Sequence, residues 1–158
     1  MSIFPTKILL ATDGSREAQL AATTAVDLAN STNSEFHVVT VAPGNPDPVY
    51  HVREASLSYE SYEQALDAVK GEAQEVLDEQ VRKIEEAGGT VKEAHFRIGE
   101  RRDQAIVHLA EDLGAGLIVL GSRGLGGVRR TLIGSVSDSV VRHAHCPVMV
   151  VRQVDGPH

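Results

Sequence analysis

The feature that most constrains this chain is the stretch over residues 117–135, which reads LIVLGSRGLGGVRRTLIGS. It begins with the apolar run Leu117–Leu120, which stops at Gly121. An uninterrupted apolar run that ends at a glycine is typical of a strand buried on both faces of a parallel sheet. A glycine-rich segment follows, and an amphipathic segment begins at Gly134 and Ser135. The stretch therefore predicts a strand, a glycine loop and a helix in close succession.

The same stretch has the composition of an anion-binding loop. Glycines such as Gly121, Gly124 and Gly134 let backbone N–H groups approach a ligand closely. A helix that begins at Ser135 directs its free N–H groups and the positive end of its dipole to the same place. Arginines such as Arg123 supply charge for phosphate oxygens. The alternative is a flexible loop with solvated arginines, but the convergence of strand, glycines, arginines and helix start favours a phosphate-binding loop.

The rest of the chain alternates between β-rich runs and amphipathic helical patterns. We expect strands over 8–11, 36–41, 91–98, 117–120 and 148–151, and helices over 16–29, 59–87, about 101–113 and from 135 onward. Alternation of this kind predicts an α/β fold in three layers, with helices on both faces of a parallel sheet. In the third strand, Ala94, Phe96 and Ile98 alternate with His95 and Arg97, which predicts a half-buried strand at the edge of the sheet.

Two helix starts carry unusual charge patterns. Arg101 and Arg102 lie where the helix dipole disfavours positive charge. We expect acidic neighbours such as Asp103 to offset them, the alternative being that they face something negative. At the last helix, Ser135 followed by Asp138 resembles a capping box.

Polar residues follow two of the predicted strands. Thr12-Asp13-Gly14 ends the first strand, and the glycine loop from Gly121 ends the fourth. Ligands of doubly wound sheets bind outside the carboxyl ends of the strands, where the strand order reverses. The two segments would share one crevice if these strands are neighbours. Asp13 could then accept ribose hydroxyls or hold a divalent cation; the alternative is an Asx turn that starts the first helix.

Composition excludes several classes of function. The net charge of −7 over 158 residues argues against a general nucleic-acid-binding protein. A single cysteine, Cys146, excludes an intrachain disulfide and fits a reducing compartment. No stretch approaches the roughly 20 apolar residues that span a bilayer, and the apolar run after Lys7 is too short for a signal peptide. We therefore expect one cytoplasmic domain with no membrane partner.

Familiar catalytic motifs are absent from the sequence. It has no Walker P-loop, no regular GxGxxG after the first strand and no G-x-S-x-G elbow. His143-Ala144-His145 has no cluster of further ligands around it apart from Cys146, so we do not expect a zinc site there. No placed nucleophile and base can be identified, which counts against fast catalysis.

Two segments resemble the universal stress protein family. Residues 121–152, GSRGLGGVRRTLIGSVSDSVVRHAHCPVMVVR, look like its C-terminal signature, and ILLATDGS over 8–15 looks like its first strand and turn. The spacing G-x2-G-x9-G-[ST] is that of the family's ATP-binding members. The resemblance implies a family domain over 1–153 with a tail over 154–158, a Rossmann-like sheet with strand order 3-2-1-4-5, and ATP as ligand. Mg²⁺ could accompany the ATP, with Asp13 as the residue that could hold it.

The resemblance also assigns site residues. It implies that Asp13 binds ribose or phosphates and that Val41 contacts adenine through its backbone. The full expected set is Thr12, Asp13, Val41, Gly121, Ser122, Arg123, Gly124, Gly134, Ser135 and Val136. His145, where a proline is common in the family, lies outside this set.

The last strand predicts an interface between two copies of the chain. The resemblance implies a homodimer through Val148, Met149, Val150 and Val151. These residues are apolar on both faces of a strand that the implied order leaves at an edge. An exposed apolar edge aggregates unless it is paired, and a two-fold mate would pair it. The alternative cover is the C-terminal tail, which is short and polar.

The sequence therefore predicts an ATP-binding regulatory module that acts in stress response as a cytoplasmic homodimer. Two alternatives remain: a slow Mg²⁺-dependent ATP hydrolase that uses Asp13, and an interaction protein that binds no nucleotide.

Overall fold

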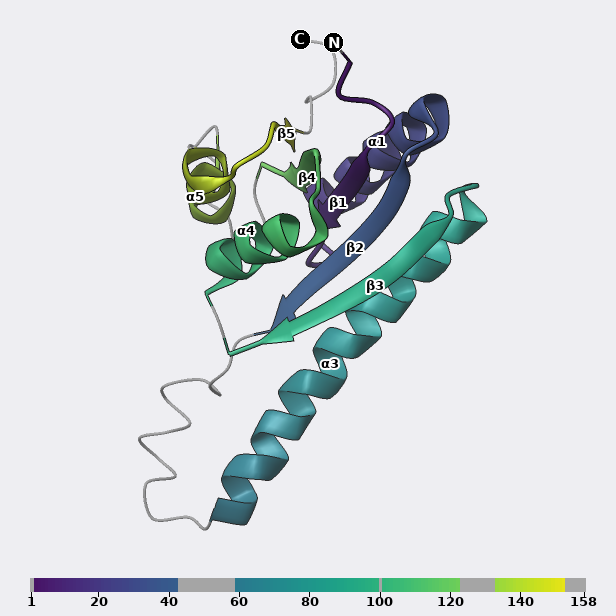
Figure 1. The fold of residues 1–158 in the computed structure, drawn as a ribbon. Coiled ribbons are helices and arrows are strands. Elements are labelled where there is room, and N and C mark those ends of the chain that lie inside the picture. The colour runs from purple at the N-terminus through teal and green to yellow at the C-terminus, as the bar shows by residue number, and fades with distance from the viewer. Residues whose placement is uncertain (1, 43–58, 100, 123–132, 153–158) are drawn as a thin grey trace, which may run out of the picture.

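The structure, a computed structural model, describes residues 2–42, 59–99, 101–122 and 133–152. Strands and helices alternate along the chain (Figure 1). The elements are β1 (Lys7–Ala11), α1 (Arg16–Thr32), β2 (Glu35–Ala42), α3 (Tyr59–Glu86), β3 (Val91–Ile98), α4 (Arg102–Leu113), β4 (Leu117–Gly121), α5 (Ser135–His143) and β5 (Val148–Val151). The expected alternation is thus confirmed. The loop expected after residue 42, Arg123, Gly124 and the tail from 154 lie outside the described residues.

The sheet is parallel and has the order β3-β2-β1-β4-β5. This confirms the five-stranded Rossmann-like arrangement. It makes β1 and β4 neighbours at the point where the strand order reverses. The helices form the two outer layers, with α1 and α3 on one face and α4 and α5 on the other (Figure 1).

The centre of the sheet is buried on both faces. Ile8 and Leu10 of β1 pack under α1 and α3, whereas Leu9 between them packs under α4 and α5. All three side chains are fully buried. A strand covered on both faces must be apolar at every position, which is why β1 and β4 show uninterrupted apolar runs instead of alternation.

Helix α1 is longer than the sequence predicted. It continues through Asn30 to Thr32 instead of ending near Ala29. In this last turn, Thr32 Oγ1 donates to the Leu28 carbonyl oxygen at 2.7 Å. Asn33 then ends the helix in the left-handed conformation with φ 56°, which asparagine tolerates better than most residues.

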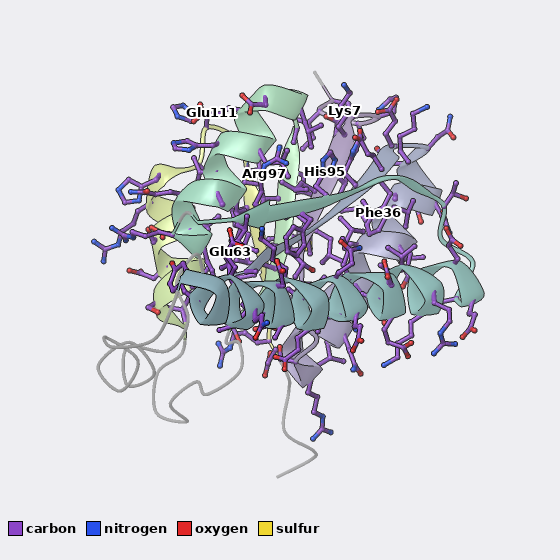
Figure 2. All side chains as sticks on the ribbon, turned by 90° about the horizontal axis from the view of Figure 1, so that it is seen from below. Lys7, Phe36, Glu63, His95, Arg97 and Glu111 are labelled. Carbon is purple, nitrogen blue, oxygen red and sulfur yellow. The ribbon has the colours of Figure 1, made fainter. Side chains whose placement is uncertain are left out.

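Strand β3 is an edge strand, as predicted, but its expected burial pattern is wrong. Ala94 is exposed, and the most buried residue of the strand is the polar His95. Figure 2 shows His95 and Arg97 on the side of β3 away from α3, whereas Phe36 lies between the sheet and α3. His95 is buried because its ring meets the ring of His37 on the neighbouring strand. Burial lowers the pKa of His95.

Among the described residues, no helix is both long enough and apolar enough to cross a membrane. The longest, α3, carries charged residues along its length, including an ion pair between Arg82 and Glu86.

Candidate functional site

A cavity of about 230 Å³ lies at the carboxyl ends of β1 and β4, where the strand order reverses. This is the position at which doubly wound sheets bind their ligands. Its lining comes from β1, β2 and β4 and from the first turns of helices: Ala11, Thr12, Asp13, Ser15, Ala18, Val39, Val41, Arg102, Ile106, Leu120, Gly121, Ser122, Gly134, Ser135, Val136 and Ser137. Of the expected site residues, all that fall within the described residues line this cavity. Arg123 and Gly124 do not fall within them.

The turn after β1 is held in place by its own polar groups. The Ser15 backbone N–H donates to Asp13 Oδ1 at 2.9 Å, so the Asx turn considered as an alternative is present. Ser15 then caps α1, because its Oγ accepts from the Ala18 N–H at 3.2 Å. Gly14 between them has φ 80°, which favours glycine. The turn fixes the Asp13 carboxylate at the cavity wall.

Thr12 is buried and anchored from two sides. Its backbone N–H donates to the Val39 carbonyl oxygen at 3.0 Å, and its own carbonyl oxygen accepts from Thr40 Oγ1 at 3.1 Å. Its hydroxyl donates to Gln80 Oε1 of α3 at 3.4 Å. Thr12 thus joins β1 to β2 and α3 and leaves little freedom for the turn that follows it.

Ser122 joins three elements at the end of β4. Its buried hydroxyl donates to Glu17 Oε2 of α1 at 3.2 Å. Its carbonyl oxygen accepts from Ser137 Oγ at 2.8 Å and from the Gly134 N–H. Its own N–H donates to the Val151 carbonyl oxygen at 2.9 Å. These contacts fix the start of α5 against the ends of β4 and β5.

Gly121 has a packing role that the sequence did not reveal. A Cβ atom at this position would lie 2.9 Å from both the carbonyl carbon and the Cβ of Glu17. Real Cβ atoms do not approach backbone so closely, so the end of β4 must be glycine for α1 to pack where it does. Close approach to a ligand is therefore not the only reason for a glycine here.

Helix α5 begins differently from the prediction. Gly134 is the N-cap residue and Ser135 the first helical residue, so the expected capping box of Ser135 and Asp138 is wrong. Asp138 instead pairs with Arg142, one turn further on, at 3.0 Å. Because glycine has no side chain, no side-chain cap satisfies the first N–H groups of α5 among the described residues.

Arg101 and Arg102, which the sequence presented as a pair, have different surroundings. Arg101 Nη2 lies 3.0 Å from Asp103 Oδ2, as expected, whereas Arg102 lines the cavity. Asp103 also accepts from Ser139 Oγ of α5 at 2.6 Å, and this bond, with the nearby Arg101 charge, lowers the pKa of its carboxyl. Arg102 is thus a site residue that sequence reasoning missed. Its position at the start of a helix could have identified it, because the helix dipole disfavours an unpaired cation there.

Three of the described helices begin at the cavity. Ser15 caps α1, Arg102 opens α4, and Gly134 caps α5, and all three line its wall. The N-terminal end of each helix carries a partial positive charge of about half a unit. Some of the first N–H groups already have partners, since Ser15 Oγ accepts from Ala18 at the start of α1 and the Asp103 carboxylate accepts from backbone N–H groups at the start of α4. The arrangement is suited to binding an anion with several oxygens, such as a phosphate chain.

Part of the cavity lining is apolar. Val39 and Val41 of β2 contribute to it, as do Ile106 of α4 and Leu120 of β4. Of these, only Val41 was expected. Val39 could have been found because residues two apart in a strand share a face, whereas Ile106 depends on how α4 packs over the sheet. A wall of this kind suits a flat, largely apolar group such as a nucleobase.

The model of the universal stress protein family matches residues 5–152. The chain belongs to this family. A universal stress protein of Staphylococcus haemolyticus is 35% identical over 150 residues, which cover 95% of this chain and 86% of that protein.

Solved structures of family members share the fold. The universal stress protein UspA from Lactobacillus plantarum has a TM-score of 0.75 and 25% identity, and the match covers 96% of this chain and 100% of UspA. The structure of a universal stress protein from Archaeoglobus fulgidus in complex with dAMP has a TM-score of 0.63 and 23% identity, with 95% and 99% of the two chains covered.

Proposed function

We propose that this universal stress protein binds ATP in the cavity between β1 and β4 and acts in the cytoplasm as a homodimeric regulatory module. The observation that carries the proposal is the lining of the site: the starts of three helices and several apolar side chains line the same cavity. An adenine nucleotide combines a charged phosphate chain with a flat base, which such a lining suits. The spacing of Gly121, Gly124 and Gly134-Ser135 also matches that of the family's ATP-binding members.

The lining residues fit the parts of ATP. Arg102 and the start of α5 at Ser135 suit the phosphate chain, since both offer donors and positive charge. Val39 and Val41 suit the base. Asp13 is the carboxylate of the described lining, and a carboxylate together with substrate phosphates is the usual ligand set of Mg²⁺. A universal stress protein of the same fold has been solved with dAMP, which supports an adenine nucleotide as ligand.

The wild-type chain is expected to retain ATP through purification, or to bind it when it is added. With no tryptophan and three tyrosines, the protein absorbs weakly near 280 nm, so bound nucleotide would dominate its ultraviolet spectrum. Chromatography after denaturation would identify the nucleotide. The preparation could instead contain no nucleotide and show no change in melting temperature with ATP and Mg²⁺, which would refute the proposal. Recovery of ADP that accumulates with time would favour the hydrolase alternative.

The two neighbouring arginines provide a matched control for this experiment. Arg102→Gln should weaken ATP binding by about 10- to 100-fold, because a hydrogen bond to a charged group contributes about 1.5–3 kcal/mol. Arg101→Gln removes the same charge one residue away, where it pairs with Asp103, and should leave the affinity for ATP nearly unchanged. Equal losses in both variants would indicate general charge attraction instead of a built site.

The homodimer is proposed through β5. This strand lies at the edge of the sheet, and all four of its side chains remain partly exposed in the single chain. Val148 and Val150 pack toward α4 and α5, whereas Met149 and Val151 pack toward α1. Such an edge carries unpaired backbone donors and acceptors beside apolar side chains, and a two-fold mate would cover both.

Val150→Lys is expected to convert the dimer into monomer or aggregate. The added charge would lie at the apolar edge strand, where it costs free energy in the paired state. Light scattering after size-exclusion chromatography measures the mass, and circular dichroism shows whether the fold is kept. An intact dimer of the folded variant would exclude β5 as the interface.

A further inference from the structure

A pair of histidines lies on the two strands at the outer edge of the sheet, outside the lining of the cavity. His37 of β2 and His95 of β3 are 3% and 8% exposed. Nδ1 of His37 lies 3.2 Å from Nε2 of His95, and the rings stack with centroids 5.4 Å apart. Glu93 of β3 is 63% exposed, and its Oε2 lies 3.9 Å from the same Nε2 atom. Two buried ring nitrogens and a solvent-facing carboxylate oxygen therefore converge at one point.

The spacing of these three atoms is that of ligands around one metal ion. Zn–N bonds of about 2.0–2.1 Å at tetrahedral angles separate neighbouring ligand atoms by about 3.3 Å. The two nitrogens of His37 and His95 already have this separation, and all three ligand atoms lie within 4.8 Å of one another. Because the Glu93 side chain is exposed, it can close the remaining gap without moving the sheet.

The far side of the His37 ring has the partner that metal-bound histidines usually have. Its Nε2 lies 3.4 Å from Oε2 of Glu35. Ligating histidines typically donate their second ring N–H to a carboxylate, which fixes the tautomer and orients the ring. With Nε2–H directed at Glu35, Nδ1 of His37 presents its lone pair toward His95.

An irregularity in the β2–β3 pairing brings these side chains together. The register pairs Phe36 with Val91 but His37 with Glu93, so β3 has one additional residue at this point. With uniform pairing, His37 would lie opposite Lys92, a cation. Bulges commonly re-aim side chains next to functional sites. This one places Glu93 beside His37, and His95 then lies two residues further along the same face.

We propose that His37, His95 and Glu93 form a binding site for a divalent transition metal ion, with Zn²⁺ as the best match. Two imidazoles and one carboxylate with a fourth position open to solvent are a common zinc ligand set. In the metal-free pair, the N–H of one ring donates a hydrogen bond to the other ring. On metal binding, that proton moves to the opposite nitrogen of its own ring, so both neutral rings offer a lone pair. The ion would join edge strand β3 to β2, and the site does not depend on nucleotide binding.

Titration of the tag-free full chain with Zn²⁺ is expected to show one ion bound per chain and a rise in melting temperature. Co²⁺ should give the visible absorption of a tetrahedral site. Glu93→Gln, at an exposed position that keeps the fold, should weaken binding more than Glu35→Gln does. Glu35→Gln removes only the orienting carboxylate, and such changes typically cost about 10- to 100-fold in metal affinity. His95→Gln should abolish binding.

A surface pair provides the matched control. His145 Nε2 lies 2.7 Å from Glu111 Oε1, and both side chains are exposed, so the pair resembles the proposed ligands without their burial. His145→Gln should leave Zn²⁺ affinity and the Co²⁺ spectrum unchanged. If wild type binds no Zn²⁺, or if Glu93→Gln binds as tightly as wild type, the histidines are a hydrogen-bonded structural pair and the metal site is wrong.

Discussion

Ser135→Asp is expected to weaken ATP binding by about 100-fold or more without lowering the melting temperature of the nucleotide-free protein. Ser135 is the exposed first residue of α5 and lines the cavity where the phosphates are proposed to bind. A carboxylate at the first turn of a helix stabilises it by about 0.3–1 kcal/mol, because it complements the helix dipole. The same carboxylate would compete with the phosphates for the N–H groups of α5 and repel them.

The size of the repulsion decides the outcome for binding. Two like unit charges about 4 Å apart near a protein surface repel by about 4 kcal/mol. A loss of about 100-fold or more in ATP affinity therefore follows, since each 1.4 kcal/mol is about a tenfold change. The variant should lose ATP affinity without losing stability. This combination is informative, because a variant that merely unfolds would lose both.

Ser135→Asn is the matched control, since asparagine has the size of aspartate without its charge. It should lose far less ATP affinity than Ser135→Asp. Isothermal titration with ATP and Mg²⁺ measures the affinities, and differential scanning calorimetry without nucleotide measures the melting temperatures. Unchanged ATP binding by Ser135→Asp would place the phosphates elsewhere and contradict the proposed site.

The alternation of strands and helices could be predicted because the periodicities of the sequence are local and strong, whereas the strand order was implied by the resemblance to the family. Apolar runs such as Leu117–Leu120 are typical of strands covered on both faces, and the alanines of α1 allow it to lie close to the sheet. The burial of His95 could not be predicted in the same way. It results from a pairing irregularity with β2 and from contact with His37, which is 58 residues away in the chain. Alternation within one strand carries no information about either.

Some residues of the candidate site could be predicted from local sequence patterns, and others could not. Residues that directly follow strands, such as Asp13 and Ser122, could be placed because the carboxyl ends of parallel strands share one edge of the sheet. Arg102 and Ile106 could not, because their position depends on how α4 packs over the sheet. Local sequence patterns therefore locate the site residues that directly follow strands, whereas the site residues contributed by helices depend on tertiary packing.

Gly121→Ala is expected to lower the free energy of unfolding of the nucleotide-free protein by about 1–3 kcal/mol, the usual cost of overpacking a well-packed interior. The new methyl group would lie 2.9 Å from two carbon atoms of Glu17, one of them backbone, so either β4 or α1 must shift. For a chain of this size, each kcal/mol lowers the melting temperature by about 2–4 °C. The loss should appear with no ligand present, which separates the packing role of this glycine from any role in binding phosphate.

Gly71→Ala is the matched control for the same substitution. Gly71 lies in the interior of α3, and a Cβ there would meet no atom within 4 Å. Replacing a helical glycine by alanine should therefore stabilise the protein by about 0.5–1 kcal/mol. Urea denaturation of both variants after removal of nucleotide measures the two changes. If Gly121→Ala is as stable as wild type but binds ATP poorly, the glycine serves the ligand alone. A loss of stability without ligand means that the segment predicted to bind phosphate also holds α1 against β4. A change in this segment that makes room for a larger ligand would then displace the start of α1, which lies beside Asp13.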